Sequence, residues 1–333
     1  MAISADYSIG TVKETTYKTY VAPTRFAEPV EPGFDWNKSI KQGVGLRNGA
    51  RVARSARRAY TSGEGKGAFT QECLSKGMGL DFEACLGSGV STVVPATTTY
   101  QHLFTLGDSP SSRTIQERMV RADGTVDAMT WLGTMVESWE LTFANDEIAM
   151  LKQNFDIGDY STAQAAVTPT YVTTPNLYHW ANASISTGTL TAPTTIALAS
   201  AVTATANIRG GSVTVNNNLQ TDRQNAGGGG RKAKPTMGLR EITGSLDIEY
   251  DSVTWRDLML TDNATTLLVQ FTAGALSSGV ETLQLVLPEI RIDTELPKPN
   301  GTELARQSVT FSGLENTSAQ NLWVVMRTAD ATL

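Results

Sequence analysis

The stretch Gly244-Ser-Leu-Asp-Ile-Glu-Tyr250 alternates apolar and polar side chains along its whole length. Successive side chains of an extended chain point to opposite faces, so Leu246, Ile248 and Tyr250 share one face and the intervening polar residues share the other. This pattern predicts a β-strand with one face in a core and the other face in water.

The same alternation recurs in four other stretches, which we also predict to be strands. They are Gly67–Cys73, Val136–Phe143, Thr282–Leu287 and Gln307–Phe311. Two segments that directly follow strands, Leu74 to Leu86 and Val253 to Leu260, place apolar residues at helical spacing. Thr, Ala, Ser and Gly are frequent and only 18% of the residues are charged, a mix that favours strands and turns. We therefore predict an all-β fold with one or two short flanking helices.

The order of these parts repeats along the chain. Phe34 to Ile40 leads through a glycine- and arginine-rich loop, Gly43 to Lys66, into a strand and a helix, and Val213 to Leu219 leads through Thr221 to Arg240 into the second strand and helix. This order indicates an internal duplication. We expect a single domain, residues 1–333, whose two similar halves, about 26–160 and 208–333, pair their sheets into one β-sandwich.

The segment between the two halves, residues 161–207, is rich in Thr and Ala and low in charge. Its aromatic part, Asn176 to Ile185, is predicted to be a connecting strand. The remainder, Thr187 to Ala206, alternates small residues with larger apolar ones. We expect extended structure there, in a possible insert whose role the sequence does not indicate.

Composition narrows the class of protein. A chain of 333 residues is long enough to bury a sizeable core. Its N-terminus lacks the basic start and apolar run of a secretory signal, and no apolar stretch is long enough to cross a bilayer, so we expect it to stay in the cytoplasm where it is made. Cys73 and Cys85 fit neither a disulfide framework nor a zinc site and are predicted to be reduced and structural. The net charge of −6 argues against a nucleic-acid-binding protein, which usually carries an excess of basic residues.

The residues that most often carry catalysis are sparse. The two histidines, His102 and His179, lie in aromatic strand patterns without a second ligand at metal-binding spacing, so we expect them to be structural. The glycine runs Gly63 to Gly67 and Gly227 to Lys232 do not fit the GxxxxGK[ST] phosphate loop, and we predict flexible hairpin tips.

Neighbouring acidic residues such as Asp81 and Glu83 have no nucleophile or oxyanion-stabilising group beside them, and we expect them to be surface carboxylates. The sequence therefore predicts no catalytic residue, no metal site and no cofactor, and the protein is not expected to be an enzyme.

One predicted loop of this acidic protein is rich in arginine. It contains Arg47, Arg51, Arg54, Arg57 and Arg58. A solvated loop is one interpretation. The other is an arm that reaches a neighbouring subunit, because the planar guanidinium binds carboxylates in a bidentate manner. Single exposed ion pairs contribute only ~0 to 1 kcal/mol, so such an arm needs repetition by symmetry or apolar anchors.

Several stretches, in this order, make the chain similar to a known family. They are Glu14 to Phe26, Gly45 to Arg58, Asp123 to Gly133, Ser138-Trp-Glu-Leu141, Leu219 to Pro235, Gly238 to Leu246 and the ending Met326 to Leu333. In these stretches, and through most of its length, the chain resembles the major tail tube proteins of siphophages.

The resemblance implies a β-sandwich with a flanking helix, long loops and terminal arms, with six copies closing into a ring and the rings stacking into a hollow tube. Such a tube, in the tail of the virion, conducts viral double-stranded DNA during its ejection into the host. The implied partners are other copies of the chain, the tape measure protein during assembly, and the tail terminator and distal tail proteins, with no membrane involved.

Site residues follow from placing the predicted elements in such a tube. Thr70, Glu72, Asp247 and Glu249 are expected to face the lumen, where acidic side chains would repel phosphate. The arginine-rich loop is expected to be the arm between subunits. A second loop is expected to contact the next ring, with Arg223, Gly227, Gly228, Gly229, Gly230, Arg231 and Lys232.

Two other classes fit parts of the sequence. A capsid decoration or baseplate-type protein is also β-rich and oligomeric, but it would not polymerise into long tubes of uniform width. A glycan-binding sandwich could use Trp36, Tyr178 or Trp180 as sugar platforms, although aromatic residues in strands more often belong to a core.

Overall fold

A computed structural model describes residues 6–205, 207–230, 232–293, 296, 305–316 and 320–333. Its elements fall into two series. The first contains β1 (Ser8–Lys13), β2 (Arg25–Ala27), β3 (Gly33–Gln42), β4 (Arg58–Glu72), α1 (Gly79–Leu86), β5 (Gly87–Val93), β6 (Tyr100–Leu106), β7 (Arg113–Val120), β8 (Val126–Ala144), β9 (Met150–Ile157) and β10 (Asp159–Ser161). The second contains β11 (Ala183–Thr191), β12 (Ser200–Thr205), β13 (Ile208–Asn216), β14 (Leu219–Gln220), β15 (Thr236–Met237), β16 (Glu241–Glu249), α2 (Thr254–Thr261), β17 (Thr265–Ala275), β18 (Val280–Ile292), β19 (Arg306–Gly313) and β20 (Trp323–Thr328).

The predicted fold class is confirmed. All five stretches chosen for their alternation lie in strands, apart from Cys73 directly after β4 and Tyr250 directly after β16. α1 forms within the segment that helical spacing indicated, and α2 ends one residue past its segment, at Thr261. Both helices are followed by a residue with a left-handed backbone, Gly87 after α1 and Asp262 after α2. Left-handed residues are common helix ends, because they let a backbone N–H satisfy one of the last carbonyls.

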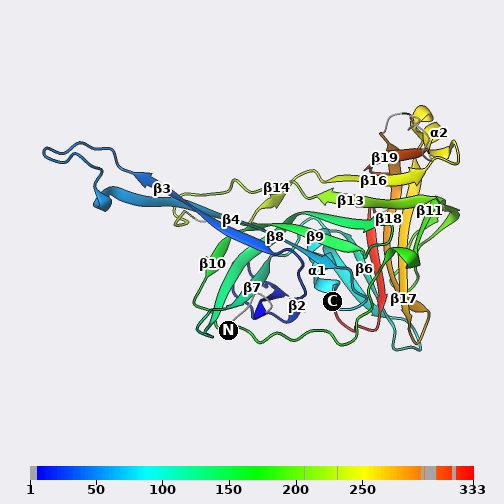
Figure 1. The fold of residues 1–333 in the computed structure, drawn as a ribbon, viewed down its shortest axis with the longest axis horizontal. Coiled ribbons are helices and arrows are strands. Elements are labelled where there is room, and N and C mark those ends of the chain that lie inside the picture. The colour runs from blue at the N-terminus through cyan, green and yellow to red at the C-terminus, as the bar shows by residue number, and fades with distance from the viewer. Residues whose placement is uncertain (1–5, 206, 231, 294–295, 297–304, 317–319) are drawn as a thin grey trace.

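The strands form three antiparallel layers around one large core (Figure 1). The first layer runs in the order β3-β4-β9-β8-β13-β16-β19-β18. The second runs β2-β1-β7-β8-β10, and the third runs β12-β11-β17-β18-β20-β6-β5. The long strands β8 and β18 each belong to two layers, so the layers are hydrogen-bonded into one continuous structure.

The strand pairings of the first series recur in the second. The hairpins β1–β2 and β3–β4 correspond to β11–β12 and β13–β16, and the pairs β1–β7, β4–β9, β7–β8, β8–β9 and β8–β10 correspond to β11–β17, β16–β19, β17–β18, β18–β19 and β18–β20. The hairpin β5–β6 occurs only in the first series and β14–β15 only in the second. The recurrence includes β1, β11 and β12, which lie outside the two halves predicted from sequence, and β2, which begins one residue before the first half.

The predicted loop Gly43 to Lys66 is wrong over its second part. Residues 58–66 belong to β4 and pair with β3, and Gly63 to Gly67 is strand instead of a hairpin tip. These glycines fit because aromatic rings lie across them: a Cβ on Gly65 would come within 2.8 Å of the Trp36 ring, and one on Gly67 within 2.2 Å of the Phe34 ring. Glycine in a strand often marks such a close approach.

Candidate functional site

One face of the first layer is polar across six strands, from β4 to β19. The core side of these strands carries buried residues such as Phe69, Leu151, Trp139, Val213 and Leu246. The opposite side carries hydroxyl and amide side chains that the pairing register brings next to each other. They include Thr70, Asn154, Ser138, Thr142, Ser212, Thr214, Thr243, Ser245, Thr310 and Ser312. We call this surface the polar face.

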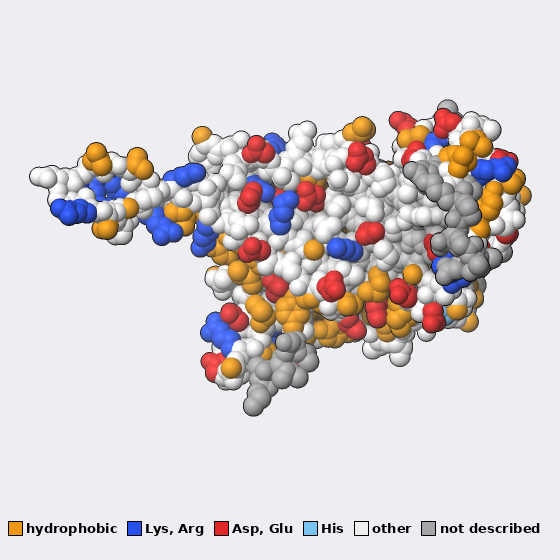
Figure 2. All heavy atoms as spheres, turned by 45° about the horizontal axis from the view of Figure 1, so that its top comes forward, with side chains coloured by type: hydrophobic (Ala, Val, Ile, Leu, Met, Phe, Trp, Pro, Cys, Tyr) orange, Lys and Arg blue, Asp and Glu red, His pale blue; other side chains and the backbone are white. Residues whose placement is uncertain are grey.

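Charges on the polar face are scattered, and carboxylates outnumber basic groups (Figure 2). The carboxylates are Glu72, Glu137, Glu140, Glu241, Asp247 and Glu249, and the basic side chains are Lys66, Lys152, Arg209 and Arg306. Two of the basic side chains are already paired with carboxylates. Lys66 Nζ lies 3.4 Å from Glu137 Oε2, and Arg209 Nη1 lies 2.8 Å from Glu249 Oε1. The face therefore offers few free cations to a polyanion.

The four residues expected in the lumen all lie on the polar face. Thr70 pairs with Lys152 and Glu72 with Met150, both on the neighbouring strand β9. Asp247 and Glu249 lie on β16, several strands away, where their partners on β19 are Ser308 and Arg306. The orientation of this face in an assembly is untested, so its place in the lumen stays a prediction.

The arginine-rich segment connects β3 and β4 and projects from the body as a long hairpin (Figure 1). Residues 43–58 are exposed except Arg54, which is half-buried. Within the described part of the chain, none of the five arginines forms an ion pair with a carboxylate. Apolar side chains share the tip: Val44 is 91% exposed, Leu46 101% and Val52 83%. We call residues 43–57 the arm connection.

The glycine-rich loop lies against the base of this hairpin. Its residues 217–240 connect β13 to β16, and we call them the body connection. Gly230 accepts a hydrogen bond from the backbone N–H of Gly63 at 2.9 Å, and its φ of +76° favours glycine. Arg223 donates to the carbonyl of Lys234, which folds the loop back on itself. Arg231 lies outside the described residues.

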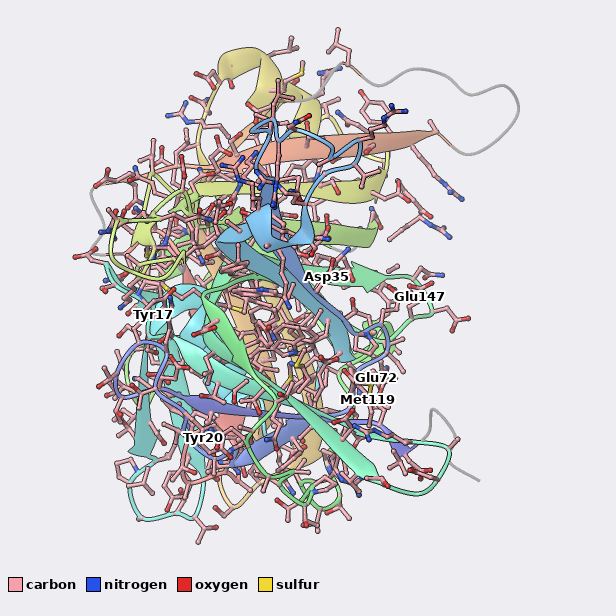
Figure 3. The ribbon with its side chains drawn as sticks, turned by 90° about the vertical axis from the view of Figure 1, so that its left-hand side faces the viewer. Tyr17, Tyr20, Asp35, Glu72, Met119 and Glu147 are labelled. Atoms are coloured by element: carbon pink, nitrogen blue, oxygen red, sulfur yellow. The ribbon has the colours of Figure 1, made fainter. Side chains whose placement is uncertain are left out.

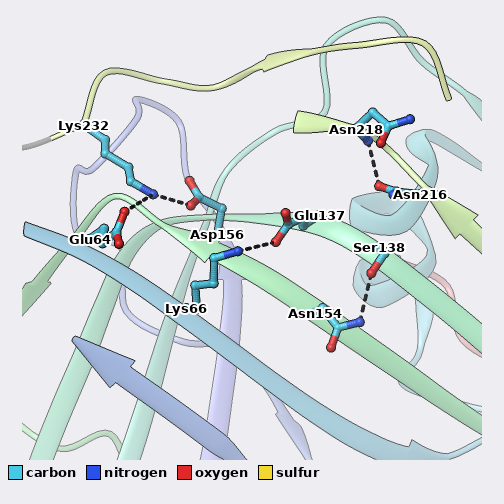
Figure 4. A network of polar contacts seen from close by, with 9 residues as sticks. All are labelled: Glu64, Lys66, Glu137, Ser138, Asn154, Asp156, Asn216, Asn218 and Lys232. Atoms are coloured by element: carbon cyan, nitrogen blue, oxygen red, sulfur yellow. Dashed lines mark hydrogen bonds and ion pairs between the residues drawn. The ribbon is translucent and has the colours of Figure 1, made fainter. Parts of the chain in front are cut away.

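Lys232 anchors the body connection in the first half of the chain (Figure 4). Its ammonium lies 2.6 Å from Asp156 Oδ1 and 3.9 Å from Glu64 Oε2, and the side chains of Lys232 and Asp156 are almost fully buried. Burial raises the pKa of Asp156, and the hydrogen bond and charge of Lys232 oppose that rise. The sequence alone places Lys232 beside the glycines of a predicted exposed loop. Its carboxylate partner could not be recognised there, because Asp156 is 76 positions away.

Other buried polar groups were missed because their partners are distant in sequence. Asp81 and Glu83 were expected at the surface, and both are buried. Asp81 accepts a hydrogen bond from Arg113 Nη1 at 2.9 Å and another from Gln71, and Glu83 lies 2.6 Å from Lys13 Nζ. These contacts hold α1 to three strands.

Glu14, near the N-terminus, is a second buried centre. Its carboxylate accepts hydrogen bonds from the Ser112 hydroxyl at 2.5 Å, from the Thr114 hydroxyl at 3.1 Å and from the backbone N–H groups of Lys18 and Gly133. Tyr17 and Tyr20, which follow Glu14 in the sequence, both lie on the left-hand side of the view in Figure 3. Glu14 therefore fixes the segment between β1 and β2 against the body.

Both cysteines and His102 are buried, and His179 is half-buried. Cys73 and Cys85 are both free and fully buried, and burial raises the pKa of each thiol, which opposes formation of the reactive thiolate. His102 is buried beside Phe104, and burial lowers its pKa to about 4. Tyr178 is fully buried, so it cannot be a sugar platform.

These features define an all-β protein with a broad polar sheet face, an open edge on β3 and a projecting arm. They are suited to association with other protein chains more than to chemistry on a substrate in a pocket. A family model described as "Phage tail tube protein" matches residues 4–313. The chain therefore belongs to the phage tail tube protein family. No curated protein matches it in sequence.

Membership in this family makes the protein a structural subunit of the virion tail that associates with its own kind. Of the helices in the described ranges, none is long and apolar enough to span a membrane.

Proposed function

We propose that the protein closes into rings that stack into a hollow tube, and that this tube conducts viral DNA without performing catalysis. The observation that carries the proposal is the polar face, a continuous sheet surface with neutral hydroxyls and an excess of carboxylates. A wall of this kind lets a polyanion pass because it offers few cations to bind phosphate and repels it weakly. Charges farther than ~8 Å from the DNA are screened and matter little.

The arm connection is the proposed contact between subunits. Its arginines have no carboxylate partner within the described part of their own chain, and its apolar side chains are almost fully exposed. Both features are explained if a neighbouring copy supplies carboxylates and an apolar surface. In the body connection, the glycines from Gly227 to Gly230 remain the proposed contact with the next ring, while Lys232 serves its own chain.

Other tail proteins are proposed partners at defined places. The tape measure protein would occupy the lumen during assembly, and the terminator and distal tail proteins would cover the two ends of the tube. These assignments rest on membership in the family.

The proposal is tested by changing charge on the polar face. Phages carrying Glu72→Gln with Asp247→Asn should assemble tails of normal length but eject DNA more slowly, because each tube loses negative charge along its wall. Ejection is timed by the fluorescence of a DNA-binding dye after the receptor is added.

The matched control carries Glu28→Gln with Asp123→Asn, which removes the same charge from exposed sites off the polar face. An ejection rate equal to that of the wild type in the first variant would count against an acidic lumen wall.

A further inference from the structure

The first layer is made of one four-strand order used twice. The order β3-β4-β9-β8 from the first half is followed, without interruption, by β13-β16-β19-β18 from the second half. The two sets correspond strand by strand through the recurrent pairings. The junction between them is the pairing of β8 with β13, which runs from Gly210 opposite Ala144 to Asn216 opposite Ser138.

The two ends of the layer carry the counterparts of the strands that meet at this junction. β3, the counterpart of β13, pairs with β4 alone among the described strands, so its other edge is open. β18, the counterpart of β8, pairs with β19 through Ile290 to Ile292, and no described strand covers its other edge at Ile292. An open edge presents unpaired N–H and C=O groups that can accept another strand.

We infer that the β8–β13 junction also shows how two copies of the chain join: β3 of one copy pairs with the end of β18 in the next. This inference rests on the proposed ring assembly. Each chain then supplies two wall units of four strands. The resemblance implies a ring of six copies; with two wall units in each chain, three chains close a ring of six units.

The recurrent register identifies which residues would meet. Gly67 and Gly244 are equivalent, and their partners on the preceding strands are Phe34 and Val213. Lys38 is therefore the counterpart of Asn217, since each lies four residues farther along.

The same glycines identify the facing residues on the other edge. They pair with Phe155 and Phe311, whose partners are Val136 on β8 and Ile292 on β18. Asp293, which follows Ile292, is thus the counterpart of Glu137.

Within the chain, Asn217 already makes the contact that this scheme assigns to Lys38. Its backbone N–H donates to the carbonyl of Glu137 at 2.8 Å, and its side-chain amide donates to the carbonyl of Val136 at 3.0 Å. In the contact between chains, Lys38 would face Ile292 and Asp293 of the next copy. Both Lys38 and Asp293 are exposed, and their charges are opposite, as a contact between copies requires.

Cysteines at these two positions test the inference. A full-length variant with Lys38→Cys and Asp293→Cys is assembled, oxidised and run on a denaturing gel, with each single variant as control. The natural cysteines do not interfere, because both are buried. We expect a ladder in which most of the chain migrates as a trimer and nothing larger accumulates, together with rings of three chains in cryo-electron micrographs of the tubes.

The outcomes separate the inference from the proposed function. Tubes whose rings contain six chains, or a ladder that continues to the hexamer, would overturn the inference and leave the tube function intact. The inference would also be overturned if the wild type forms tubes and the assembled double variant forms no cross-link. Folded wild-type protein that forms no tube at any concentration would overturn the proposed function, and the inference with it.

Discussion

The two hairpin connections occupy equivalent places in the two halves and behave in opposite ways. The arm connection, residues 43–57, projects into solvent with its arginines and apolar side chains exposed. The body connection, residues 217–240, lies against the molecule, and a buried ion pair between Lys232 and Asp156 holds it there. One connection is fixed by its own chain, and the other is left for a partner.

The flanking strands explain this difference. β13 pairs with β8 on one side and β16 on the other, so the hairpin β13–β16 is enclosed in the layer. Among the described strands, β3 has a partner on one side only and β4 pairs with β9 only from Gly65 onward, so residues 43–57 project beyond the body. The same hairpin is thus a structural element in one half and an assembly element in the other.

Breaking the anchor of the body connection should have the largest effect on stability. Lys232→Ala leaves the Asp156 carboxylate buried without its ammonium, and removal of one partner of a buried ion pair costs about 3–5 kcal/mol. The free energy of unfolding, measured by urea titration, should fall by this amount. Lys234→Ala is the control, since the Lys234 ammonium contacts only the exposed Ser109 hydroxyl.

A second variant separates the charge from the packing. Lys232→Met with Asp156→Leu removes both charges and should recover most of the lost stability. Equal losses in Lys232→Ala and Lys234→Ala would show that the body connection is not held by this pair.

A pH titration compares the pairing of β6 with β20, which joins the two halves of the chain, with the arm connection. His102 on β6 pairs with Met326 on β20, and burial lowers its pKa from 6.5 to about 4, with Asp330 opposing the shift and Arg25 reinforcing it. The folded protein therefore disfavours the charged ring. Stability from this group is complete above pH 6.5 and is lost as the pH falls toward 4, by up to about 3 kcal/mol.

The measurement is the difference in unfolding free energy between the wild type and His102→Gln at several pH values. The wild type should lose more stability between pH 6.5 and 4 than the variant does. The arm connection contains no histidine or carboxylate of its own, so its contribution to assembly should stay constant until carboxylates of the neighbouring copy begin to be protonated, at about pH 4. Parallel pH profiles for the two proteins would contradict the prediction.

Removing the apolar side chains from the arm connection should weaken assembly without changing the monomer. Burying a Val or Leu side chain contributes about 1.5–3 kcal/mol, so Leu46→Ser with Val52→Ser should raise the critical concentration for tube formation at least tenfold. The critical concentration is measured by sedimentation, and the melting temperature should stay the same. Leu239→Ser in the body connection, where the side chain is 88% exposed, should have little effect. A similar shift in both variants would remove the distinction between the two connections.

Arg54 and Arg57 in the arm connection, with Arg58 at the start of β4, should have the smallest effect per side chain, because exposed ion pairs contribute only ~0 to 1 kcal/mol each. Replacing Arg54, Arg57 and Arg58 with Ala should leave a folded monomer that polymerises poorly and whose remaining assembly depends less on salt. Light scattering at several salt concentrations measures both. Tubes that form normally, with the salt dependence of the wild type, would refute the role of these arginines.

Features that depend only on local periodicity, such as strands and the direction of their side chains, were predicted from the sequence. The alternation in Gly244 to Tyr250 identified a strand and its polar face, because side-chain direction depends only on position along an extended backbone. The alternation could not reveal that Trp36 and Phe34 lie across the glycines of β4, since that contact joins two strands. For the same reason Lys232, Asp81 and Glu83 were predicted at the surface: their partners are distant in sequence and meet only after folding.

The β8–β13 junction has a consequence for how assembly begins. Two strands that belong to one chain meet at a high effective concentration, so this junction does not come apart on dilution. If every second junction of a ring is of this kind, fewer independent molecules must be immobilised before the ring closes, and less translational and rotational entropy is lost. Covalent continuity would then lower the nucleation barrier of the tube while leaving its wall unchanged.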